Sequence, residues 1–180
     1  MEFVEITMDN ILEATDIQMA IFGPKECAYL CYLQHIQNND PAYYIVKDSS
    51  GNNIGISGIY VEPFEPNTAW LGWYGVLSEC RNKGYGTKIL EHTIEIAKNN
   101  GYKNFRLYTD VINPKAHKLY DKIMDFSEEY VEDKYTVLVY SKTLCEEPCN
   151  KLNNKCINLA SKSNEQDDGY EMYLELKNRI

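Results

Sequence analysis

The sequence predicts a single mixed α/β domain in which helices flank a central sheet. Its length of 180 residues is that of one ordinary domain. Segments with the apolar spacing of helices alternate with shorter segments rich in β-branched and aromatic residues. Near the middle of the chain, a strand, a glycine-rich loop, a helix, a second strand and a second helix follow one another.

The first part of the chain is expected to form two helices among four strands. Residues 1–7 alternate in the manner of a strand, and Asp9 is a candidate N-cap for a helix over residues 10–21. A second helix is expected over residues 25–37. Its predicted buried residues are Ala28, Leu30, Cys31 and Ile36. Three strands are expected next, over residues 42–48, 53–63 and 68–77.

The third of these strands contains two glycines, Gly72 and Gly75. Glycine inside a strand pattern marks a bulge or the close approach of another group. The two glycines are therefore the first indication that a ligand contacts this strand.

The second part of the chain begins with its strongest helix pattern, over residues 84–100, which ends at Asn100-Gly101 as a C-cap does. A strand is expected over residues 104–111. Asn113-Pro114 then opens a helix to about Met124, with Asn as N-cap and Pro at the first helical position. Residues 129–144 are expected to form the last two strands. Beyond Cys145 the pattern is polar, and residues 170–178 fit either a strand or a helix.

Composition excludes several classes of function. The net charge of −9 argues against nucleic-acid binding, which needs a basic face. An acidic surface is compatible with amine substrates, although it also serves plain solubility. The first ten residues lack the pattern of a secretory signal, and no segment reaches the ~20 continuous apolar residues of a membrane helix. We therefore expect a cytoplasmic protein without membrane contact.

The cysteines do not predict a metal site. In a cytoplasmic protein, the six cysteines are expected to be free thiols. Cys145, Cys149 and Cys156 are closely spaced, but a zinc site needs a fourth ligand. The three histidines, His35, His92 and His117, all lie far upstream. We expect no bound metal.

The glycine-rich loop has the features of an anion site. A helix N-terminus has unpaired N–H groups and a favourable dipole for negative charge. Gly84 and Gly86 allow an anion to approach the backbone closely. Arg81 and Lys83 cost about 0.3–1 kcal/mol each at a helix N-terminus unless an anion lies between them. The spacing matches neither the phosphate loop of nucleotide hydrolases nor the dinucleotide-binding loop.

The segment Arg81–Gly86 matches [RQ]-x-x-G-x-[GA], and here the chain resembles the GCN5-related N-acetyltransferase (GNAT) family. A second segment is similar to the family pattern N-x-x-A-x-x-L-Y-x-K-x-G-F. Its matching residues are Asn113, Ala116, Leu119, Tyr120, Lys122 and Phe126. Asp125 replaces the family's glycine, and Asp is tolerated in the left-handed turn that we expect there. The resemblance covers residues 76–126.

The resemblance implies the GNAT fold, a mixed central sheet of about six to seven strands flanked by about four helices. We assign this domain to residues 1–144. Residues 145–180 form a C-terminal extension that is expected to pack on the same domain, because its end is too apolar for a disordered segment. Three roles stay open for the extension: folding over the active site, mediating a homodimer, or forming a mobile tail.

The resemblance also implies acetyl-CoA as co-substrate and direct attack of an amine on its thioester in a ternary complex, without a metal. The fourth-strand residues Tyr74, Gly75 and Val76 would offer main-chain groups to pantetheine and the acetyl carbonyl. The residues expected around the pyrophosphate are Arg81, Asn82, Lys83, Gly84, Tyr85, Gly86 and Thr87. Asn113 matches a position that contacts the cofactor or serves only as an N-cap. Tyr120 matches the general acid that protonates the leaving thiolate.

The general base and the acceptor site are less defined by the resemblance. Candidate bases are Asp110, Tyr108, Glu62 and Glu65, which otherwise are solvated surface groups. Aromatic residues that either line the acceptor pocket or belong to the core are Trp70, Trp73, Tyr60 and Phe64. A small-molecule amine is the expected acceptor. The alternatives are transfer to a protein lysine or N-terminus, and a noncatalytic domain that binds acyl-CoA.

Overall fold

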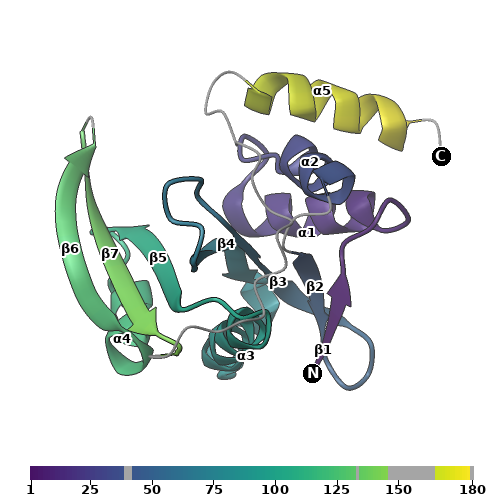
Figure 1. The fold of residues 1–180 in the computed structure, drawn as a ribbon. Coiled ribbons are helices and arrows are strands. Elements are labelled where there is room, and N and C mark those ends of the chain that lie inside the picture. Colours follow the sequence, from purple (N-terminus) through teal and green to yellow (C-terminus); the bar gives the residue numbers. More distant parts are fainter. Residues whose placement is uncertain (39–41, 133, 146–164, 179–180) are drawn as a thin grey trace.

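The structure is a computed structural model that describes residues 1–38, 42–132, 134–145 and 165–178 (Figure 1). Seven strands form one sheet in the order β1-β2-β3-β4-β5-β7-β6. The strands are β1 (Glu2–Glu5), β2 (Tyr43–Lys47), β3 (Asn53–Tyr60), β4 (Thr68–Val76), β5 (Asn104–Asp110), β6 (Asp125–Glu132) and β7 (Tyr135–Thr143). The helices are α1 (Ile11–Phe22), α2 (Tyr29–Asn38), α3 (Tyr85–Asn99), α4 (Pro114–Ile123) and α5 (Glu165–Lys177). The predicted order of elements is confirmed.

The sheet opens into a fork between β4 and β5. All other neighbouring strands are antiparallel, whereas these two are parallel and pair only over Thr68–Trp70 and Asn104–Arg106. Beyond that point the described residues contain no further pairing between them, although β4 continues to Val76 and β5 to Asp110. The facing edges of both strands therefore present main-chain polar groups to the opening.

The two faces of the sheet carry different helices. On one face, α3 and α4 cover a core that includes Phe105, Leu107 and Tyr120. On the other face, α1 and α2 cover β2, β3 and β4 around Ile45 and Ile56 (Figure 1). Over β5, β7 and β6 this second face has no helix in the described part of the chain. On this second face, the side chains of β5, β7 and β6 are thus not covered by a helix of the described chain.

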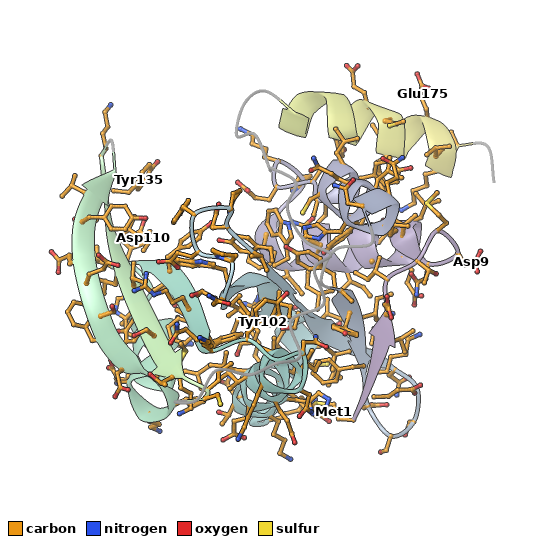
Figure 2. The ribbon with its side chains drawn as sticks, in the orientation of Figure 1. Met1, Asp9, Tyr102, Asp110, Tyr135 and Glu175 are labelled. Atoms are coloured by element: carbon orange, nitrogen blue, oxygen red, sulfur yellow. The ribbon has the colours of Figure 1, made fainter. Side chains whose placement is uncertain are left out.

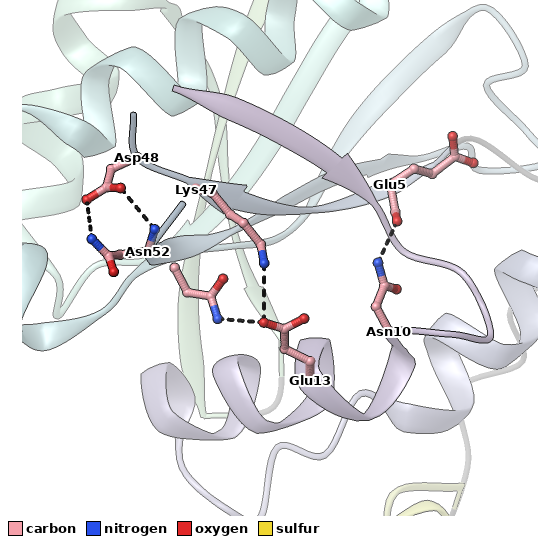
Figure 3. A network of polar contacts seen from close by, with 7 residues as sticks. Glu5, Asn10, Glu13, Lys47, Asp48 and Asn52 are labelled. Carbon is pink, nitrogen blue, oxygen red and sulfur yellow. Dashed lines mark hydrogen bonds and ion pairs between the residues drawn. The ribbon is translucent and has the colours of Figure 1, made fainter. Parts of the chain in front are cut away.

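The turn between β2 and β3 and the start of α1 are held by polar contacts (Figure 3). Asp48 accepts hydrogen bonds from the main chain and side chain of Asn52, which lower the pKa of this carboxyl. Glu13 of α1 binds Lys47 of β2 across 3.4 Å. These contacts fix α1 against the edge of the sheet.

Two helix starts differ from the prediction. The N-cap of α1 is Asn10 and not Asp9, and the Asn10 side chain donates to the carbonyl of Glu5. Helix α2 begins at Tyr29, because residues 23–28 form a loop with a turn at residues 24–25. Its fully buried residues are Tyr29 and Tyr32, whereas Leu30, Cys31 and Ile36 are only partly buried. Tyrosines therefore form the packing face that aliphatic residues were expected to form.

The glycines of β4 have a packing role. A Cβ atom at Gly72 would lie 2.2 Å from the hydroxyl of Tyr43, and one at Gly75 would lie 2.5 Å from the side chain of Ile21. The expectation that a ligand requires these glycines is thus wrong on this face of the strand. The expected bulge is present, since the register shifts by one residue between Ile56 and Gly58, and Trp73 has a φ of 35°.

The left-handed turn expected at Asp125 is also absent. It begins β6 directly after Met124, which is extended with φ −131° and ψ 165°. Among the described non-glycine residues, positive φ occurs only at Trp73 and Asn82. The chain therefore passes from α4 into β6 without the left-handed turn that we expected, and Asp125 needs no special conformation.

The end of the chain forms helix α5, which packs on α1 and α2 (Figure 1). Tyr173 is 2% exposed and donates a hydrogen bond to Asp16, which also binds Lys177. Cys149 and Cys156 lie outside the described residues. Within the described residues, no group of three potential metal ligands occurs, and no helix has the length and apolar character to cross a membrane.

Candidate active site

The loop between β4 and α3 has a strained backbone that only some residues adopt. Asn82 and Gly84 both have left-handed conformations, with φ values of 61° and 78°. A Cβ atom at Gly84 would meet nothing within 4 Å, so glycine is favoured there by its backbone and not by crowding. Left-handed residues in such a loop turn successive N–H groups toward one point, which forms a concave site for an anion.

The start of α3 completes this anion site. Gly84 is its N-cap and supplies no side chain to the first N–H groups, which have no acceptor within the helix. Arg81 donates from Nε to the carbonyl of Val76 at 3.0 Å, which places its guanidinium beside the end of β4. Lys83 is exposed in the same loop. The N–H groups, the dipole and the two cations together fit a pyrophosphate.

Tyr74 joins β4 to the first turn of α3. Its hydroxyl donates to the carbonyl of Gly86 at 2.8 Å. Burial and the nearby Tyr120 raise the pKa of Tyr74, so this hydroxyl stays protonated as a donor. A Cβ atom at Gly86 would lie 3.1 Å from the same hydroxyl. Gly86 thus leaves space for the hydrogen bond from Tyr74, which links the first turn of α3 to β4.

Helix α4 begins at the end of β5 with a complete cap. Asn113 accepts a hydrogen bond from the N–H of Ala116 at 3.3 Å, and Pro114 follows as the first helical residue. Asp110 accepts from the N–H of Ile112 at 3.0 Å, and its carbonyl oxygen lies 2.9 Å from Nε2 of His117. The predicted N-cap role of Asn113 is confirmed. Figure 2 shows Asp110 at the tip of β5.

Tyr120 lies in the core between α4 and the sheet. It is 7% exposed, and its ring centroid is 5.5 Å from that of Tyr140. Burial, with a smaller contribution from Tyr140, raises the pKa of Tyr120 to about 12. Its phenol is therefore protonated at neutral pH, which suits a proton donor and not a proton acceptor.

The opposite face of the fork carries an aromatic and charged cluster. Trp70 lies between Tyr60 and Tyr108, with ring centroids 6.4 Å and 6.5 Å away. The guanidinium of Arg106 lies 5.6 Å from the Trp70 ring. Arg106 also binds Glu65 at 2.9 Å. Trp70, Tyr108 and Glu65, three candidate acceptor contacts, are thus brought into one cluster, and their contact with an acceptor stays a prediction. Burial, followed by the nearby Tyr108 and Glu62, raises the pKa of Tyr60.

Two residues of this cluster escaped the sequence analysis. Arg106 stands between the buried Phe105 and Leu107, and this alternation would have placed it on the face without core residues. Glu128, which lies 3.7 Å from Arg106, comes from β6 and has no local signal. Conversely, Trp73 packs edge-on against Phe22 of α1 and is not part of this cluster. Phe64 is 76% exposed and lines a cavity together with Glu65 and Arg106.

The comparisons with known proteins agree with this geometry. The family model described as "Acetyltransferase (GNAT) family" matches residues 9–126. No curated protein has a matching sequence. Similar solved structures include a chimera of the Vibrio cholerae spermidine N-acetyltransferase SpeG and hSSAT, with 17% identity and a TM-score of 0.69, covering 80% of this chain and 96% of that one.

Two further structures are similar. The spermidine N-acetyltransferase from Vibrio cholerae in complex with CoA and spermine has 16% identity and a TM-score of 0.67, over 84% of this chain and 98% of that one. A dodecameric structure of that enzyme has 14% identity and a TM-score of 0.64, over 79% and 93%. The fold is shared at these identities. The chain belongs to the GNAT acetyltransferase family and is an acyltransferase that uses acetyl-CoA.

Proposed function

We propose that this enzyme transfers the acetyl group to the primary amine of a small molecule by direct attack in a ternary complex. The observation that carries this proposal is the fork between β4 and β5, with the anion site at its end and a buried, protonated tyrosine beside it. The names of the similar structures support a small amine acceptor, since they are spermidine N-acetyltransferases.

The chain's own groups would hold the cofactor at two places. The N–H groups from Arg81 to Thr87 would bind the pyrophosphate, with Arg81 and Lys83 as counter-charges. The main-chain groups of Tyr74, Gly75 and Val76 that face the fork would pair with pantetheine. Because β5 leaves this edge of β4 unpaired, such pairing would complete the sheet locally. Asn113 would contact the cofactor only in addition to its capping role.

Acetyl-CoA supplies a thioester whose carbonyl carbon accepts the amine. Main-chain N–H groups of β4 at the fork would stabilise the negative charge that develops on the carbonyl oxygen. Tyr120 would donate its proton to the departing sulfur, since its phenol is protonated at neutral pH. Holding both reactants in the fork would supply much of the remaining acceleration.

Asp110 remains the preferred candidate for the base. Its carboxylate is only partly buried, and one oxygen accepts a hydrogen bond from Ile112. Glu65 is the weaker candidate, because its carboxylate is bound to Arg106 and this ion pair would have to break before a proton is accepted. Tyr108 and Glu62 remain candidates for contact with the acceptor on the same face.

The proposal is tested by measuring acetyl-CoA-dependent thiol release with polyamines, amino sugars, amino acids and short peptides. Wild type, Tyr120→Phe and the control Tyr140→Phe are compared, because Tyr140 packs on Tyr120 but is not proposed to touch the thioester. We expect turnover with a small amine, and a kcat about 100- to 10,000-fold lower in Tyr120→Phe alone. Turnover only with peptides would contradict the small-molecule acceptor. An undiminished kcat would remove Tyr120 from the mechanism.

A further inference from the structure

A polar cavity lies where β4 and β5 begin, whereas the loop of the candidate anion site follows the end of β4. It has a volume of about 350 Å³ and is formed by the loop before β4 together with the ends of β5 and β7. The polar residues that line it include Glu65, Thr68, Asn104, Arg106, Ser141 and Thr143. None of the residues from Arg81 to Thr87 lines it, and neither does Tyr120. This cavity is therefore distinct from the cofactor site.

The cavity lies on the same face of the sheet as the aromatic and charged cluster around Trp70 and Arg106. Thr68 pairs with Asn104 and Trp70 with Arg106, and Arg106 in turn pairs with Ser141. These side chains share the face opposite to the core residues Phe105 and Leu107. At about 3.3 Å per strand residue, Thr68 is roughly 13 Å from the fork at Gly72. A molecule of that length would reach from the fork into the cavity.

The charges of the cavity are already paired within the chain. Arg106 is bound by Glu65 at 2.9 Å and by Glu128 at 3.7 Å. Lys142 donates to the carbonyl of Ile123 at 2.7 Å. Among the lining residues, Glu65 and Arg106 compensate each other's charge, and the ammonium of Lys142 is held at the carbonyl of Ile123; Glu128 does not line the cavity. A site for a polycation would instead present unpaired carboxylates, and a site for an anion would present unpaired cations.

The remaining lining is rich in neutral polar groups. Thr68, Ser141 and Thr143 provide hydroxyls, each of which both donates and accepts. Oε2 of Glu65 is buried and has no hydrogen-bond partner among the described residues. A buried acceptor without a partner is unfavourable, and a ligand that donates to it removes this cost. A hydroxyl group is a neutral donor that satisfies both observations.

We propose that this cavity is a distal acceptor subsite that binds the hydroxylated, uncharged end of an elongated amine, such as an amino sugar. The amine end lies at the fork and the hydroxylated end donates to Glu65 and bonds to the hydroxyls of β4 and β7. Trp70, which is 9% exposed, lies along β4 between the two ends. This inference rests on the proposed function.

The first experiment compares three acceptors by kcat/KM. A glucosyl-glucosamine disaccharide carries its one amine on one ring and only hydroxyls on the other, octylamine has a similar length without hydroxyls, and propylamine is too short to reach the cavity. We expect the disaccharide to exceed octylamine by at least tenfold, because only the distal end of the disaccharide donates to Glu65. A kcat/KM for octylamine that equals or exceeds that of the disaccharide overturns the proposal.

The second experiment alters the cavity. Ser141→Met fills it, Ser141→Ala removes one hydroxyl, and Ser50→Ala is a matched control in the distant turn between β2 and β3. We expect the KM of the disaccharide to rise at least tenfold in Ser141→Met and about two- to fivefold in Ser141→Ala, whereas the KM of acetyl-CoA stays within twofold in all three. A disaccharide KM unchanged in Ser141→Met overturns the proposal.

A binding measurement separates failure of this inference from failure of the proposed function. Should no acceptor be acetylated, titration calorimetry of the disaccharide with the CoA-saturated protein still tests the cavity. Binding to wild type that is lost in Ser141→Met supports the subsite even without turnover. Absence of binding to wild type overturns it. Thermal unfolding of each variant confirms that the protein is folded.

Discussion

Helices α3 and α4 occupy equivalent places in the fold, but their N-termini differ. Each helix follows one strand of the fork, α3 after β4 and α4 after β5. Helix α4 is closed by the side chain of Asn113 and by Pro114. Helix α3 starts at Gly84, which has no side chain to cap it. The N-terminus of α4 is capped by a side chain of the chain itself, whereas that of α3 has no side-chain cap and, in our proposal, binds an external anion.

The largest effect is expected when the open N-terminus receives a negative charge. Gly84→Asp places a carboxylate beside the site of the pyrophosphate, and we expect the Kd of acetyl-CoA to rise roughly 100- to 1,000-fold through like-charge repulsion. Gly84→Asn is the matched control, since Asn has the same shape, tolerates a left-handed backbone and is neutral. Titration calorimetry gives both constants. Equal losses in the two variants would mean that charge is not the cause.

A slightly smaller effect is expected from the tyrosine on α4. The pKa of Tyr120 is about 12 in the folded protein, against about 10 for an exposed tyrosine. Between these pH values the unfolded chain releases the proton first, so stability falls as the pH rises from about 10 to about 12. Tyr120 contributes at most roughly 3 kcal/mol to this fall.

Urea unfolding from pH 9 to pH 12 measures this fall in wild type and in Tyr120→Phe. The variant is expected to lose less stability over this range, because phenylalanine has no proton to release. Tyr135→Phe is the control, since Tyr135 is 63% exposed and its substitution should leave the wild-type slope unchanged. Parallel curves for Tyr120→Phe and wild type would contradict the assignment of the raised pKa.

An intermediate effect is expected at the cation of the loop. Arg81→Gln removes the charge that Val76 holds beside the end of β4, and we expect the Kd of acetyl-CoA to rise about tenfold, as for one charge-assisted hydrogen bond. The salt dependence of Kd should become weaker as well. Lys98→Gln, at the far end of α3, is the control. A similar shift in that control would indicate a general field effect.

The smallest effect is expected at the cap of α4. Asn113→Ala should lower the free energy of unfolding by about 1 kcal/mol, the usual cost of losing an N-cap, and Asn113→Ser should restore most of it. Urea unfolding gives both values. If the Kd of acetyl-CoA rises in both variants, Asn113 contacts the cofactor in addition to capping. If it stays constant in both, capping is its whole role.

The two helix starts also explain how much the sequence could predict. Glycines with flanking cations and an Asn-Pro pair are local signals, because capping involves residues within one turn. The cap of α4 could therefore be located before the structure, and the anion site stays a prediction. The fork could not, since it depends on where the pairing of β4 and β5 stops, which no short pattern records.

Contacts between distant segments account for the errors. Gly72 suggested a ligand, but it is required by Tyr43, which is neighbouring only after β2, β3 and β4 have paired. The ion pairs of Arg106 join three separate segments, so neither Glu65 nor Glu128 could be assigned to it beforehand. Asp125, which replaces the glycine of the family pattern, lacks the left-handed conformation that we expected, because here the strand starts directly after the helix.

The packing of α5 on α1 has a consequence for synthesis of the chain. Asp16 meets Tyr173 across 157 residues, so the cluster around α1 and α2 is completed only by the last part of the chain. We expect a ribosome-bound chain that lacks α5 to form the β4–α3–β5–α4 region first, while the surface of α2 stays uncovered and available to chaperones. Pulse proteolysis of nascent chains ending before and after residue 177 would detect this order as late protection of α1 and α2.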